Sequence, residues 1–140
     1  MFLLDTNVIS ELRKFGDGKA DARVTAWIAE REAVSLYISA LTLMELEIGV
    51  LRIERRDIGQ GERLRTWMDR YVVPEFQERT LPVDSSVALR CARLHVPNPH
   101  AERDALIAAT ALVHGMAVVT GNKADFEITG ARVIDPWTGT

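Results

Sequence analysis

The chain has 140 residues, 47% of them hydrophobic, and its formal net charge at neutral pH is −3. This length favours a single domain over residues 1–140, with enough apolar side chains to build its own core. The negative balance argues against a protein that holds nucleic acid through an overall positive field, but it does not exclude a local basic rim.

Cysteine and histidine give no metal-binding pattern. The single cysteine, Cys91, cannot form an internal disulfide, and we interpret it as a small core residue. His95, His100 and His114 lack partners at ligand spacing and are interpreted as structural or surface residues. No apolar run approaches the roughly 20 residues needed to cross a bilayer, and no secretory signal opens the chain, so we expect a cytoplasmic protein without membrane association.

Short β-rich runs alternate with helix-like segments along the whole chain. The expected strands are residues 2–5, 36–39, 80–83, 117–120 and 132–134. The expected helices are residues 8–14, 22–32, 41–56, 62–73, 85–95 and 102–114, with loops at 14–21, 57–62 and 96–100. This alternation predicts an α/β fold with a mainly parallel sheet and helices on both faces.

The first expected strand runs directly into a carboxylate, Asp5. In parallel α/β sheets, ligands bind beyond the carboxyl ends of the strands, so an acid at this position is a candidate site residue. An Asp that follows a strand can equally cap the next helix by accepting backbone N–H groups. The sequence leaves both interpretations open.

A second acid, Glu45, lies near the start of the helix expected over residues 41–56. At about 100° per residue, one apolar stripe of this helix consists of Leu41, Met44, Ile48 and Leu51. Glu45 falls on the edge of that stripe. A carboxylate there is costly unless a charged group meets it, which makes Glu45 a candidate site residue.

Three further polar residues follow later strands and turns. Asp104 lies in the first turn of a helix that is apolar nearly all round, although the helix dipole alone would favour an acid there. Asn122 and Asp125 come just after the fourth expected strand, where Gly-Asn is also an ordinary turn signal. If the sheet is parallel, these side chains and Asp5 face one crevice.

A cluster of carboxylates repels itself unless a cation neutralises it. Oxygen ligands without His or Cys favour Mg²⁺ or Mn²⁺ over zinc. A carboxylate-bound Mg²⁺ suits phosphodiester hydrolysis, because it orients a water and neutralises charge developing on the phosphate. The candidate catalytic and metal-binding residues are Asp5, Glu45, Asp104, Asn122 and Asp125.

Five motifs together resemble the PIN-domain ribonucleases, and among them the VapC-type toxins of the FitB-like branch. They are "LLDTNVISEL", "ELEIGV", "DALIAATALVHG", "VVTGNKADF" and "VIDPW", and they cover the chain in the expected order. The resemblance implies a PIN-like α/β/α sandwich around a five-stranded sheet and a Mg²⁺- or Mn²⁺-dependent endoribonuclease that cuts tRNA or other structured RNA. It also implies a cognate VapB-like antitoxin whose tail lies over the active site, and a homodimer or a larger assembly with that antitoxin.

Carried over by position, Asp5, Glu45 and Asp104 match the family's acidic triad. The next position stays open between Asn122 and Asp125. An Arg that is common before this Asn is replaced by Gly121. By the same resemblance, Thr6 hydrogen-bonds at the metal site.

An acidic crevice needs a basic rim to hold RNA. The rim candidates are Arg13, Lys14, Arg52, Arg55, Arg56, Arg63 and Arg65. The helix over residues 41–56 also carries more apolar residues than one buried face requires, including Leu43, Leu46 and Val50. These extra apolar residues are consistent with a surface that binds a partner protein, or with a helix that is buried on two sides.

Alternative functions remain open. One is a catalytically weak or silent RNA-binding member of the family, because Asn122 adds no negative charge. Another is a phosphatase with an aspartyl nucleophile, which normally wants a second Asp where this chain has Asn7. A nucleotide-binding doubly wound domain would need a glycine-rich turn after the first strand, and the sequence has none there.

Overall fold

The computed structural model describes residues 1–139 and contains one five-stranded parallel sheet. The strands are β1 (Phe2–Leu4), β2 (Leu36–Ser39), β3 (Thr80–Leu81), β4 (Ala117–Val119) and β5 (Val133–Ile134), in the order β3-β2-β1-β4-β5. Phe2 pairs with Leu36 on one side and with Ala117 on the other, which places β1 in the centre. The predicted strands are all present, most of them one or two residues shorter than expected.

Helices connect the strands. They are α1 (Thr6–Arg13), α2 (Ala22–Ala29), α3 (Ala40–Arg56), α4 (Ile58–Trp67), α5 (Val73–Glu75), α6 (Ser85–Leu94), α7 (Glu102–His114) and α8 (Lys123–Glu127). Two 3₁₀ turns, η1 (Lys14–Asp17) and η2 (Ala33–Ser35), and one π-helical segment, η3 (Met68–Val72), complete the path. Every helix in the described chain falls short of the length and hydropathy that crossing a bilayer requires.

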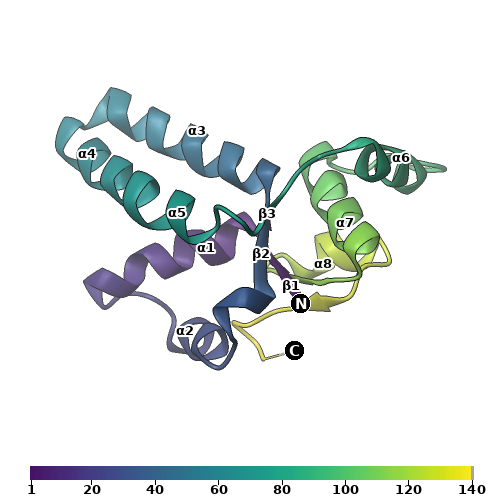
Figure 1. The fold of residues 1–140 in the computed structure, drawn as a ribbon, viewed down its shortest axis with the longest axis horizontal. Coiled ribbons are helices and arrows are strands. Elements are labelled where there is room, and N and C mark those ends of the chain that lie inside the picture. Colours follow the sequence, from purple (N-terminus) through teal and green to yellow (C-terminus); the bar gives the residue numbers. More distant parts are fainter. Residues whose placement is uncertain (140) are drawn as a thin grey trace.

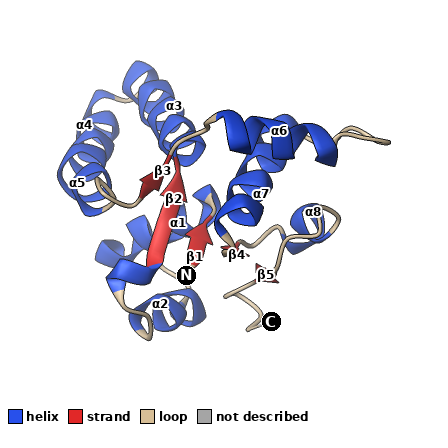
Figure 2. Cartoon of the chain, turned by 45° about the vertical axis from the view of Figure 1, so that its right-hand side comes forward, coloured by secondary structure: helices blue, strands red, loops and turns tan. Residues whose placement is uncertain are grey.

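The sheet is covered on both faces, which confirms the predicted α/β/α sandwich. Figure 1 shows α1 to α5 on one side of the strands and α6 to α8 on the other, and Figure 2 shows the same division after a 45° turn. Successive residues of a strand point to opposite faces. Accordingly, Leu4 and Val119 belong to the core cluster under α1 to α3, whereas Leu3 and Val118 belong to the cluster under α7 and α8. Cys91 is buried in a third, small cluster between α6 and α7, as predicted.

The buried face of α3 differs from the predicted stripe. Thr42, Leu46 and Val50 are buried, whereas Met44 and Leu51 are 40% and 48% exposed. The prediction failed because apolar residues surround this helix, so their spacing alone could not select the face. Polar Thr42 lies on the inner side and interrupts the pattern there.

The glycine-rich stretch after α3 is helical, although a loop was predicted at 57–62. Asp57 caps α4 by accepting a hydrogen bond from the backbone N of Gln60 at 3.0 Å. A Cβ atom on Gly61 would lie 2.7 Å from the Cα of Glu54, so this glycine lets α4 pass closely against α3. The glycine therefore serves helix packing and does not break the helix.

Arg65 fixes α4 against α3. Its guanidinium donates to both carboxylate oxygens of Glu47 at 2.8 and 2.7 Å, and to Glu54 at 3.1 Å. Asp69 lies within 3.5 Å of the same group. We call residues 40–67 the α3–α4 hairpin; Figure 1 shows its two helices lying side by side and reaching beyond the sheet.

Candidate active site

Asp5 lies at the carboxyl end of the central strand and is only 5% exposed. One of its carboxylate oxygens accepts a hydrogen bond from the backbone N of Thr6 at 2.8 Å. The other accepts one from the hydroxyl of Thr120, which follows β4, also at 2.8 Å. Asp5 thus caps α1, which confirms the capping interpretation, and it also lines a cavity.

Asn7 joins the ends of β1 and β4. Its side-chain N donates to the hydroxyl of Thr120 at 3.3 Å, and its side-chain O accepts from the backbone N of Gly121 at 3.1 Å. The same Thr120 hydroxyl accepts from the backbone N of Asn122 at 3.0 Å. This set of contacts holds the residue 121–122 turn beside Asp5.

Glu45 projects from the second turn of α3. The hydroxyl of Thr6 donates to its carboxylate at 2.6 Å, which orients Glu45 toward the end of β1. The guanidinium of Arg103, from the first turn of α7, lies 3.7 Å from the other carboxylate oxygen. Arg103 therefore places a positive charge beside this half-buried acid.

Four of the five candidate residues line one cavity of about 470 Å³. It is lined by Asp5, Glu45, Asp104 and Asn122, together with Thr6, Asn7, Ser10, Glu11, Lys14 and Trp137. We call it the acidic cavity. Asp125 does not line it; this exposed residue lies with Asp104 on a neighbouring cavity of about 140 Å³.

The surroundings of Asp5 and Asp104 disfavour the charged forms of these two carboxylates. Burial raises the pKa of Asp5 to about 6, the charges of Asp104 and Glu45 add to this rise, and the hydrogen bonds from Thr120 and Thr6 oppose it. Burial also raises the pKa of Asp104, with smaller contributions from the charges of Asp125 and Glu45. A bound cation would relieve this repulsion.

The donor set suits a hydrated hard cation. Within residues 1–139, no group of three or more His, Cys, Asp or Glu side chains is arranged to hold a metal ion directly. Mg²⁺ usually keeps several of its waters and binds through one or two carboxylates. The oxygens that line the acidic cavity, with no His or Cys among them, fit such an ion better than zinc.

Trp137 forms part of the cavity wall and was not predicted as a site residue. Its backbone N donates to Asp135 at 2.9 Å. A Cβ atom on Gly121 would lie 3.0 Å from the indole ring, so the ring occupies the space that a side chain at position 121 would need. The only signal in the sequence was the closing motif "VIDPW", which does not reveal this contact.

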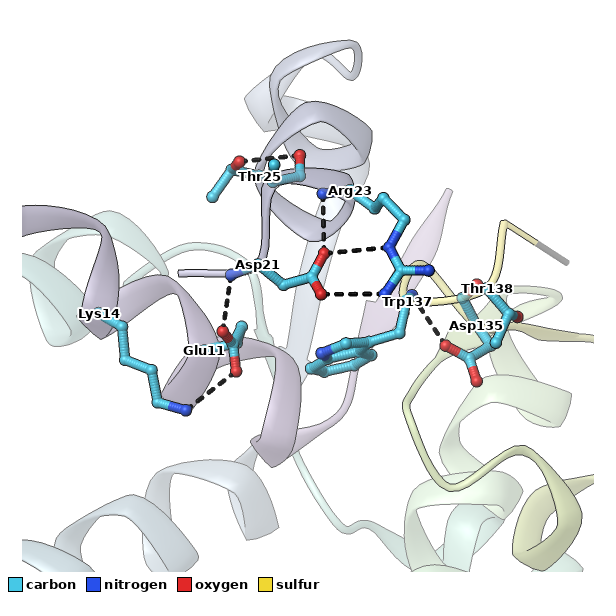
Figure 3. Close-up of polar contacts among 9 residues, drawn as sticks. Glu11, Lys14, Asp21, Arg23, Thr25, Asp135, Trp137 and Thr138 are labelled. Atoms are coloured by element: carbon cyan, nitrogen blue, oxygen red, sulfur yellow. Dashed lines mark hydrogen bonds and ion pairs between the residues drawn. The ribbon is translucent and has the colours of Figure 1, made fainter. Parts of the chain in front are cut away.

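Glu11, a further acid in the cavity wall, is engaged in structural contacts. It accepts hydrogen bonds from the backbone N of Asp21 at 2.8 Å and from Lys14 at 3.2 Å. The contact with Asp21 is the main cause of its lowered pKa. Figure 3 shows that Asp21 connects Glu11 on one side with Arg23 on the other. These contacts tie α1 to the start of α2 at the edge of the acidic cavity.

Similar proteins share this fold over nearly their whole length. The chain is 36% identical to the VapC ribonuclease Y4jK of Sinorhizobium fredii, with 98% of each chain covered. It is 34% identical to the toxin FitB of Neisseria gonorrhoeae, covering 98% of this chain and 99% of FitB. The solved structure of FitAcB from Neisseria gonorrhoeae superposes with a TM-score of 0.89 at 32% identity, covering 98% of this chain and 99% of that one.

A model of the PIN domain matches residues 2–130. The chain belongs to the PIN domain family, and within it to the group that contains the VapC ribonuclease Y4jK and FitB. This confirms the resemblance in the sequence.

Proposed function

We propose that this protein is an endoribonuclease toxin that hydrolyses RNA phosphodiester bonds and is neutralised by a VapB-like antitoxin. The observation that carries the proposal is the acidic cavity, where Asp5, Glu45 and Asp104 meet at the carboxyl ends of parallel strands. The relatives named VapC ribonuclease and toxin FitB support the activity and its biological setting.

In this proposal, Asp5, Glu45 and Asp104 would hold a hydrated Mg²⁺ or Mn²⁺, part of this set through the ion's own waters, with Asn122 as an uncharged oxygen donor and Asp125 acting on Asp104 through its charge. The chemistry that such an ion supplies is activation of a water and neutralisation of charge on the phosphate. The chain itself orients the ligands: Thr120 and the backbone of Thr6 hold Asp5, and the Thr6 hydroxyl holds Glu45.

The proposed substrate is tRNA or another structured RNA, cut in a single-stranded loop. Bases in loops can splay out and bring one phosphate to a recessed site, which a regular duplex does not allow. The proposed assembly is a homodimer, or a larger complex with the antitoxin, in the cytoplasm. Met44 and Leu51 on α3 are roughly half exposed, and these apolar side chains supply a surface that a partner could cover.

A catalytically weak RNA-binding protein is the second candidate. It is favoured by Asn122, which lines the acidic cavity with an uncharged amide and adds no negative charge there. An aspartyl phosphatase has less support, because the residue two positions after Asp5 is Asn7, which donates hydrogen bonds to Thr120 and Asp5.

Cleavage of total tRNA by the purified protein, with Mg²⁺, with Mn²⁺ and with EDTA, tests the proposal. We expect cleavage only with a metal, and its loss in Asp5→Asn and Asp104→Asn. Glu78→Gln is the matched control, because it removes one negative charge from an exposed residue far along the chain from these acids. Binding of RNA without cleavage would favour the second candidate, and a covalent phosphate on Asp5 would favour the phosphatase.

A further inference from the structure

The acidic cavity continues into a longer groove. It shares Thr6, Ser10 and Glu45 with a second cavity of about 210 Å³ between α1 and the α3–α4 hairpin. That second cavity shares Arg13, Leu64 and Trp67 with a third of about 620 Å³. Because neighbouring cavities share wall residues, the three form one path that leads from the carboxylates toward η1 and α4.

The far end of this path is basic. Its wall contains Arg13, Lys19 and Arg63 and one acid, Asp17. We call this third cavity the basic groove. Among the ion pairs of residues 1–139, none involves any of its three cations. Their charges therefore remain available to an anionic ligand.

Two other basic residues near the path are already engaged. Lys14 contacts Glu11 at 3.2 Å, and Arg65 contacts Glu47 and Glu54 within the α3–α4 hairpin. Of the predicted basic rim, Arg13 and Arg63 line the basic groove, Lys14 and Arg65 form ion pairs, and Arg52, Arg55 and Arg56 line none of the three cavities. Lys19, which the sequence did not single out, also lines the basic groove.

The middle of the path has a different character. Leu46, Val50 and Ile53 line it, and the half-buried Trp67 lies at the junction with the basic groove. Apolar and aromatic walls suit bases and sugars, because every base has a face that can stack, whereas cations suit phosphates. The order along the path is therefore carboxylates, apolar wall, cations.

We propose that the basic groove binds backbone phosphates of a single-stranded RNA segment whose scissile phosphate lies in the acidic cavity. This inference depends on the proposed nuclease function, and it adds where the flanking nucleotides lie. Arg13 and Arg63 present planar donors that match phosphate oxygens, and Lys19 adds a third positive charge. The Arg65 contacts with α3 hold α4, and with it Arg63, in a fixed position over the groove.

The experiment measures binding separately from cleavage. Fluorescein-labelled 12-residue polyuridylate is titrated with the protein in EDTA, so that no cleavage occurs, and anisotropy gives the Kd at several salt concentrations. We expect Lys19→Ala combined with Arg63→Ala to raise the Kd about tenfold. The slope of log K against log salt should fall by about 1.4, since each single-strand phosphate contact contributes about 0.7.

Two controls accompany this measurement. Arg132→Ala removes the same kind of charge from an exposed residue just before the amino end of β5, whereas the acidic cavity lies at the carboxyl ends of β1 and β4, and it should leave the Kd unchanged. Lys19 and Arg63 are exposed, so the double variant should also keep the parent's unfolding temperature.

An unchanged Kd and salt slope in the double variant would overturn the inference. A loss confined to antitoxin binding would also overturn it, because the groove would then be a protein-binding surface. The proposed nuclease function fails by a different result: the parent protein would bind polyuridylate through the basic groove but cut no RNA with either metal.

Discussion

The hydroxyl of Thr120 donates to the buried carboxylate of Asp5, with 2.8 Å between the two oxygens. This contact joins the ends of two neighbouring strands across 115 positions of the chain. It also opposes the rise that burial causes in the pKa of Asp5. One hydroxyl therefore serves both the packing of the sheet and the charge state of the proposed metal ligand.

Replacing Thr120 with Val should destabilise the protein by about 1–3 kcal/mol, because a buried carboxylate loses a hydrogen bond. The pKa of Asp5 should rise further, so the pH at which cleavage reaches half its maximum should shift upward. Urea unfolding and a pH–rate profile measure the two effects. Thr110→Val is the matched control: Thr110 is equally buried but donates only to the backbone of Leu106, so the pH–rate profile should stay in place.

The charge of Asp5 should make the metal-free protein less stable as the pH rises. The folded pKa is about 6 and the ordinary value is 3.8, so the folded state binds the proton more tightly. Protonation of Asp5 therefore stabilises the folded state. This contribution to the free energy of unfolding is complete below pH 3.8 and is lost as the pH rises to 6. A difference of about two pKa units corresponds to about 3 kcal/mol.

Asp5→Asn removes this titration. In EDTA, the variant should therefore be more stable than the parent at pH 8, and the difference should shrink toward pH 4. Urea unfolding at the two pH values measures it. Parallel stability curves for parent and variant would contradict the pKa assigned to Asp5.

Adding Mg²⁺ should raise the unfolding temperature of the parent protein, more at pH 8 than at pH 5, because protons compete for the same carboxylates. A metal at about 100 times its Kd stabilises a folded protein by about 2.7 kcal/mol. Calorimetry with and without Mg²⁺ measures the shift. Glu45→Gln combined with Asp104→Asn should abolish it, and a shift of equal size in that double variant would place the ion elsewhere.

Gly61→Ala should destabilise the α3–α4 hairpin by about 1–3 kcal/mol, because its Cβ would lie 2.7 Å from the backbone of Glu54. Gly59→Ala is the matched control in the same helix. There the nearest atom, in the Asp57 side chain, lies 3.7 Å away, so the higher helix propensity of Ala should leave the protein equal or slightly more stable. The unfolding temperatures of both variants distinguish the effect of packing from that of helix propensity. An equal decrease in unfolding temperature in the two variants would show that the glycine at 61 has no packing role.

Local patterns predicted most of the strands and helices and the acids that lie at their ends. The position of Asp5 after a β-rich run and of Asp104 in a first turn followed from the strand and helix periods together with parallel topology. The start of α4 was missed because Gly61 indicated a loop, whereas its lack of a side chain serves contact with Glu54.

Long-range contacts account for the remaining differences. The pairing of Arg65 with Glu47 and Glu54 depends on how two helices pack, so the sequence could not show that this basic residue is engaged. The same holds for Trp137 in the wall of the acidic cavity, since its place depends on Gly121. Basic or aromatic residues that look equivalent in the sequence therefore differ in role, because tertiary packing decides which of them form ion pairs and which line the cavity.

The close contact between Gly121 and the ring of Trp137 means that the residue allowed at one position depends on the residue at the other. A side chain at position 121 would bring its Cβ to 3.0 Å from the indole of Trp137, so the ring would have to shift to admit it. With glycine at position 121, this protein presents the flat ring of Trp137 in the wall of the acidic cavity. We therefore expect that an arginine at position 121 is accommodated better when Trp137 is replaced by a smaller residue at the same time.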